Sequence, residues 1–276
     1  MCARQFKQQN TNMGLTIHYS LKSEGADTHA KKVVQMLHQT AQDLPFEEVG
    51  EIIDLSAAEC DIDRRGQDDP LRWLQIQAGK NVELTASKSE KQESSRWMRV
   101  QPERLIAFGT WPGEGCEEAN FGLCTFPASV QTDAGQVATN LSGWRWGAFC
   151  KSQYSSNPAC GGVPNFLRCH LSIIALLDKA KELGCLDHVD DEGGYWESRN
   201  LPALVEQVGS WNQMMAAFGG LLKDLAPGGG ASVVAEVAQY PNFEQLEAAG
   251  QDKLPPELRS LVKLIRQTGS RRPPTS

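Results

Sequence analysis

The stretch "MGLTIHYSLKSEGADTHAKKVVQMLHQTAQDL", residues 13–44, decides the fold class. In its first part Leu15, Ile17 and Tyr19 alternate with polar residues, which predicts a half-buried strand. "SEGAD" is a turn, and Asp27 or Thr28 can cap a helix that starts there. The apolar residues that follow recur at helical spacing: Val33, Val34, Met36, Leu37, Ala41 and Leu44. With a return strand around 49–55, the stretch predicts a β-α-β unit.

The segments that follow predict an α+β fold in which this unit is extended into a mainly antiparallel sheet. Residues 56–70 form a polar loop, 71–77 ("LRWLQIQ") a strand, and 78–95 a polar excursion that fits a hairpin. Two more strands are expected at 96–100 and 103–111. The centre, residues 109–162, is expected to be rich in loops, and residues 164–184 and 200–225 to be helices in a helical C-terminal half.

The same patterns suggest three parts of the chain. Residues 1–12 are expected to be a flexible extension, and 13–225 a single α+β domain. Residues 226–276 are expected to hold a linker ("APGGGAS"), a short terminal helix and a basic tail. One domain is favoured because the central tryptophans have few other places to be buried.

Composition narrows the class of protein. The chain has 276 residues, of which 40% are hydrophobic and 22% charged, as in folded proteins. The net charge of −7 argues against nucleic acid as a partner. No apolar run approaches the roughly 18 residues of a membrane span, and the first residues lack the apolar core of a signal peptide. The eight cysteines are therefore expected to be reduced thiols in a cytoplasmic protein.

Aromatic and cationic residues in the central segments are the strongest candidates for ligand contacts. Aromatic rings can stack on sugars, bases or cations, and the cations can meet an anionic group. The candidate ligand-binding residues are Trp111, Asn120, Trp144, Arg145, Trp146, Lys151, Tyr154, Tyr195 and Trp196. In the alternative interpretation these tryptophans only cover the edge of a core.

Two acidic segments offer carboxylates for acid–base chemistry, "WPGEGCEEANFG" (111–122) and "HVDDEGGYW" (188–196). Glu117 and Asp191 are the candidate acid and base. The same carboxylates could hold Mg²⁺ or Ca²⁺, or be solvated turns. Cys150 is a candidate nucleophile, because Arg145 and Lys151 beside it could lower the pKa of its thiol.

A zinc site is a weaker possibility. It would use Cys116, Cys124, Cys150 and Cys160, but these residues are separated by seven or more positions, whereas zinc sites favour tight pairs such as C-x2-C. The chain also lacks the glycine-rich nucleotide motifs GxGxxG and GxxxxGK[ST]. The sequence therefore specifies no cofactor.

These observations predict an enzyme-like protein that binds a small polar ligand, such as a sugar or nucleotide fragment. The ligand would lie in a pocket of aromatic, cationic and acidic loops, where acid–base hydrolysis or transfer is possible chemistry. Two alternatives remain open. The Trp-rich surface could bind a protein partner without catalysis, or the chain could be a zinc-stapled module.

Overall fold

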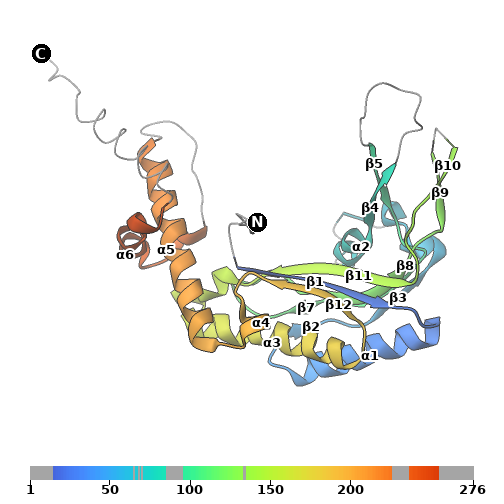
Figure 1. Ribbon diagram of the computed structural model, residues 1–276, viewed down its shortest axis with the longest axis horizontal. Coiled ribbons are helices and arrows are strands. Elements are labelled where there is room, and N and C mark those ends of the chain that lie inside the picture. The colour runs from blue at the N-terminus through green and yellow to red at the C-terminus, as the bar shows by residue number, and fades with distance from the viewer. Residues whose placement is uncertain are drawn as a thin grey trace, which may run out of the picture.

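A computed structural model describes residues 15–64, 66–67, 69, 71–84, 96–132, 135–225 and 236–254 (Figure 1). The predicted extension 1–12, the tip of the predicted hairpin, the linker 226–232 and the terminal helix with its basic tail lie outside the described residues. Among the described residues, no helix combines the length and the apolar character needed to cross a membrane.

A six-stranded antiparallel sheet forms the centre of the molecule. Its order is β12 (Leu186–Asp191), β1 (Thr16–Ser23), β11 (Trp144–Lys151), β8 (Phe121–Thr125), β6 (Arg104–Phe108) and β3 (Ile53–Ser56). All five neighbouring pairs are antiparallel. The sequence prediction of an α+β fold with a mainly antiparallel sheet is therefore confirmed. The first and return strands of the predicted β-α-β unit are β1 and β3. Three other strands lie between them in the sheet, so they do not pair.

Three small ribbons accompany this sheet. They are β2 (Glu48–Val49) with β7 (Thr110–Trp111), β4 (Lys80–Leu84) with β5 (Arg96–Val100), and β9 (Ser129–Thr132) with β10 (Gly135–Ala138). The predicted strand at 96–100 is β5, and it pairs with β4, which lies within the polar excursion that was expected to form a hairpin by itself.

Helices α1 (Asp27–Asp43) and α3 (Gly162–Glu182) cover one face of the large sheet, whereas α2 (Arg72–Ala78) and the β4–β5 ribbon lie above the other face (Figure 1). Four residues of the predicted α1 stripe, Val33, Val34, Leu37 and Ala41, face the core, whereas the predicted Met36 is exposed and Leu44 follows the end of the helix. The remaining helices are α4 (Tyr195–Ser198), α5 (Leu201–Leu225) and α6 (Phe243–Gly250). Short 3₁₀ turns are η1 (Ala57–Cys60), η2 (Ile62–Arg64), η3 (Gln153–Ser156), η4 (Pro158–Cys160), η5 (Glu236–Gln239) and η6 (Gln251–Lys253).

The strand prediction for residues 71–77 is wrong, because this segment belongs to helix α2. Apolar and polar side chains alternate only loosely in these seven residues. So short a run fits both the strand period of two and the helix period of about 3.6 residues. Packing decides between them. Leu74 and Ala78, one turn apart, are buried against the sheet, while Trp73 and Gln77 share another side of the helix.

The loop prediction for residues 109–162 is also wrong, because β8 and β11 lie within it. Along β11, Trp144, Trp146, Ala148 and Cys150 face the core and the residues between them do not. Gly122 of β8 and Gly147 of β11 are strand residues. Gly122 lies opposite Ala107 in the β8–β6 pair, where neighbouring backbone leaves no space for a side chain. Strand β12 also replaces a predicted acidic loop. It is an edge strand, so its polar side chains can face solvent.

Gly122→Ala should lower the free energy of unfolding by about 1–3 kcal/mol, as overpacking of a core does. The added Cβ would lie 2.5 Å from the Cβ of Ala107 and 2.7 Å from the carbonyl oxygen of Ile106. Urea denaturation measures the change.

Gly209→Ala is the matched control. Gly209 lies in helix α5, and a Cβ added there meets nothing within 4 Å. It should raise stability by about 0.5–1 kcal/mol, because alanine favours a helix interior over glycine. Equal stability of wild type and Gly122→Ala would contradict the tight β6–β8 packing.

Candidate functional site

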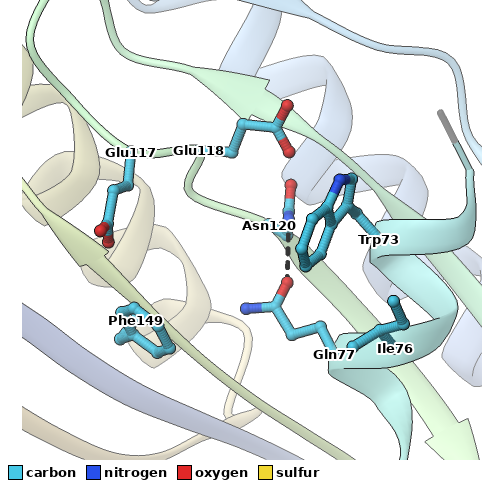
Figure 2. Close-up of a pocket in the computed structure, with 7 residues that line it drawn as sticks. All are labelled: Trp73, Ile76, Gln77, Glu117, Glu118, Asn120 and Phe149. Carbon is cyan, nitrogen blue, oxygen red and sulfur yellow. Dashed lines mark hydrogen bonds between the residues drawn. The ribbon is translucent and has the colours of Figure 1, made fainter. Parts of the chain in front are cut away.

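A cleft of about 460 Å³ lies between α2 and β11 on the face of the sheet opposite α1 and α3. Figure 2 shows the side chains that line it: Trp73, Ile76, Gln77, Glu117, Glu118, Asn120 and Phe149. Its volume lies in the range of small-molecule sites.

Two aromatic rings stand at opposite walls of this cleft (Figure 2). Trp73 of α2 is 66% exposed and Phe149 of β11 is 50% exposed. Phe149 faces outward because it alternates with the buried Ala148 and Cys150. Trp73 shares one side of α2 with Ile76 and Gln77, which lie three and four residues further on. Large apolar side chains left in water on facing walls are typical of a binding surface.

Asn120 forms the floor of the cleft, and hydrogen bonds hold both its backbone and its side chain. Its backbone carbonyl accepts hydrogen bonds from the Tyr19 hydroxyl and from Nε1 of Trp146, each at 2.8 Å. Its side-chain Nδ2 donates to Oε1 of Gln77 at 2.8 Å. The remaining atom, Oδ1, is buried and has no hydrogen-bond partner. A buried acceptor without a donor is costly, so this oxygen needs an explanation.

The carboxylates of the cleft add further acceptors. Glu117 Oε2 accepts the backbone N–H of Lys151 at 3.2 Å. Glu118 has no hydrogen-bond or ion-pair partner in the part of the chain described here, and Figure 2 shows its carboxylate facing the amide oxygen of Asn120. Two acceptors that face each other define a place for a group that donates several hydrogen bonds, above all a cation.

A second cavity, of about 420 Å³, continues the cleft along β11. The two cavities share Ile76, Gln77 and Phe149. The second one is also lined by His18, Tyr19, Ser20, Gly79, Arg99, Gly147, Ala148 and His188. His18 lies opposite Phe149 in the β1–β11 pair, with the ring centroids 5.8 Å apart.

Of the residues predicted from the sequence, Glu117 and Asn120 line the cleft. Trp144 and Trp146 are buried on the face of β11 that points toward the core, as in the alternative interpretation that they cover a core. The cationic residues beside them are engaged elsewhere. Arg145 Nε donates to the Ser142 carbonyl at 2.8 Å, and Lys151 Nζ donates to the Tyr154 hydroxyl at 3.2 Å. The indole of Trp111 donates to the Cys116 carbonyl at 3.3 Å.

Asp191 lies on the opposite side of the sheet from the cleft. It is placed across from the core residue Ile17 in the β12–β1 pair and is only 5% exposed. Its carboxylate accepts the backbone N–H groups of Gly193, Tyr195 and Trp196, each at 2.9 Å. Tyr195 and Trp196 therefore belong to a capped turn packed against the core, and the three predicted loops do not converge on one cavity.

A buried Ser–His–Asp chain joins β11, α3 and β12. Nε2 of His170 lies 3.3 Å from Asp191 Oδ2, and its Nδ1 lies 3.1 Å from Ser152 Oγ. Since an ionised carboxylate only accepts, Nε2 of His170 donates to Asp191. A serine nucleophile must reach a substrate, yet Ser152 and His170 are both fully buried. The chain of bonds therefore serves to connect the three elements.

Two of the predicted cysteines, Cys124 and Cys150, are also buried, whereas Cys116 and Cys160 are partly exposed. Cys150 is fully buried and its thiol donates to the Glu117 carbonyl at 3.1 Å, so no ligand in the cleft reaches it. Cys124 donates to the Arg145 carbonyl at 3.0 Å, and burial raises the pKa of its thiol to about 12. The four cysteines of the predicted zinc site, Cys160 included, are not gathered. Within the described residues, no group of three His, Cys, Asp or Glu side chains is placed to hold a metal ion.

Sequence reasoning missed Trp73, Ile76, Gln77 and Phe149. The signal for the first three was present as an i, i+3, i+4 pattern, but it was assigned to a strand. Phe149 lies in the same aromatic segment as Trp144 and Trp146, but on the opposite face of β11. The sequence prediction chose the two tryptophans instead. Comparisons with protein families, with curated proteins and with solved structures find no match to this chain.

Asp191→Asn should lower the free energy of unfolding at pH 7 by about 1–3 kcal/mol, the range for losing charge-assisted hydrogen bonds. Burial by itself raises the pKa of this carboxyl, but the hydrogen bonds from His170, Trp196 and Gly193 outweigh it and leave the pKa below its ordinary value. Its stabilisation is therefore present above the unfolded-state pKa, about 3.9, and is lost as the pH falls through the folded-state pKa.

The difference between wild type and Asp191→Asn should consequently shrink below about pH 4, as measured by urea denaturation from pH 7 to pH 2.5. Asp190→Asn, one residue away on the exposed side of β12, is the control and should cost little. A difference that stayed constant across this pH range would contradict the assignment.

Proposed function

We propose that the cleft between α2 and β11 binds a small molecule that carries a flat apolar ring and a positively charged, hydrogen-bond-donating group. The ring would lie between Trp73 and Phe149, and the charged group would be held by Glu118 and the Oδ1 atom of Asn120. The observation that carries this proposal is the pair of unpartnered acceptors facing each other beside two exposed rings.

The aromatic walls favour a ring over an open sugar chain or an ion. A planar ligand would cover the exposed faces of Trp73 and Phe149, which removes apolar surface from water. The aromatic faces also attract a nearby positive charge through the ring quadrupole. A concave site of this volume favours a small molecule over a flat protein partner.

The acidic end favours a cation over an anion. Glu117, Glu118 and Asn120 present only acceptor oxygens toward a ligand at this end, apart from the Asn120 amide that already donates to Gln77. An ammonium, guanidinium or amidinium group would satisfy the buried Oδ1 of Asn120 and neutralise the carboxylate of Glu118. If the site supports acid–base chemistry, its carboxylates are Glu117 and Glu118 rather than Glu117 and Asp191.

Phenethylamine, a ring joined to an ammonium, is the simplest probe. Isothermal titration calorimetry should show saturable one-to-one binding. Trp73→Ala and Glu118→Gln should each weaken binding by about tenfold or more, since a charge-assisted hydrogen bond or a ring contact contributes about 1.5 kcal/mol.

Matched controls keep this test specific. Trp97→Ala removes the other highly exposed tryptophan, 61% exposed on β5, and Glu114→Gln removes a carboxylate from the same loop that does not line the cleft. Both should leave the affinity within about twofold. Equal effects of the control and test substitutions, or no saturable binding, would overturn the proposal.

A further inference from the structure

The second cavity gives the cleft a cationic end, which extends the proposed function to a class of ligand. The site described above uses only the acidic first cavity. Beyond the shared residues Ile76, Gln77 and Phe149, the lining changes to Arg99, His18 and His188. The cleft therefore runs from an acidic end, with Glu117 and Glu118, to an end lined by basic side chains.

Lys80 adds a second positive charge beside this end, next to the lining residue Gly147. A Cβ built on Gly147 would lie 2.5 Å from Nζ of Lys80, so the ammonium stands directly over β11 at a residue that lines the second cavity. Lys80 forms no hydrogen bond or ion pair with any other residue that the structure describes. A side chain at position 147 would collide with the lysine head, so the glycine leaves room for it.

Arg99 reaches the same cavity from β5. Its guanidinium donates to the carbonyl of Ile76 and lies against Gly79, at the C-terminal end of α2. This hydrogen bond holds the planar group at the wall of the cavity. The nearby acids belong to the edge strand β12 and do not line the cavity. Asp187 accepts a hydrogen bond from Ser20, and Asp190 lies opposite His18.

The distance between the two charged ends follows from the register of β11. Glu117, the chain neighbour of Glu118, accepts a hydrogen bond from the backbone N–H of Lys151, which places the acidic end near Lys151, and Lys80 stands over Gly147. Four residues of extended strand span about 13 Å, at roughly 3.3 Å per residue. The ammonium and carboxylate of a free α-amino acid are far too close together to meet both ends. An extended peptide of about four residues places its terminal charges at this separation.

We propose that the natural ligand of this cleft is a short extended peptide with free termini, whose ammonium meets Glu118 and the Oδ1 atom of Asn120 and whose carboxylate meets Lys80 and Arg99. An apolar side chain near its N-terminus lies between Trp73 and Phe149. The inference rests on the proposed function for its acidic end and adds the carboxylate end.

The experiment uses the full chain and three probes: Phe-Ala-Ala-Ala, the same peptide with a C-terminal amide, and phenethylamine, which is part of the N-terminal residue of both peptides. Calorimetry should show the free acid binding at least about tenfold more tightly than the amide, as one charge-assisted contact provides. In Lys80→Met the preference for the free acid over the amide should shrink by about threefold or more, because only Arg99 then remains to meet the carboxylate. Lys32→Met, an exposed lysine of α1 on the other face of the sheet, should keep the difference.

The outcomes separate this inference from the proposed function. If phenethylamine binds through Glu118 and the free acid gains nothing over the amide, the peptide inference is overturned and the proposed function stands. If neither phenethylamine nor the peptide binds, both are overturned. The comparison of acid and amide on the wild-type protein needs no variant, so a folding defect in Lys80→Met leaves it decisive.

Discussion

The backbone carbonyl of Asn120 is the point on which the cleft depends. It accepts one hydrogen bond from Tyr19 of β1 and one from Trp146 of β11, both inside the core. A buried carbonyl with both lone pairs engaged is fixed in position, because breaking either bond would strand a polar group away from water. Asn120, the residue just before β8, is therefore anchored to both β1 and β11.

This constraint links the core to the cleft. With its backbone fixed, Asn120 can present its side chain only toward α2, where Gln77 accepts from it. The short loop of Glu117 and Glu118 is held in turn by the bond to the Lys151 amide. Hydrogen bonds that involve the backbone thus fix the positions of the acceptor groups in the cleft. Trp73 faces the cleft because of its side of α2, and Phe149 because side chains alternate along β11.

The polar bonds on the other side of the sheet have a different role. Ser152, His170 and Asp191 join β11, α3 and β12 beneath the surface, and the Asp191 carboxylate also caps α4. Ser152 cannot act as a catalytic nucleophile here, because its hydroxyl is fully buried and no substrate can reach it. Titratable groups that suggest chemistry in a sequence can thus serve folding, and burial separates the two roles.

The sequence by itself determined the α+β class, the first strand and helix, the strand at 96–100 and the long helices, because periodicity is a local property. It also singled out Glu117 and Asn120, and both line the cleft. Only the tertiary structure decided that residues 71–77 form a helix, that Trp144 and Trp146 are buried, and that Asp191 lies across the sheet from Glu117. Those outcomes depend on strand order and on which face of β11 meets the core, and both are fixed by contacts between residues far apart in the chain.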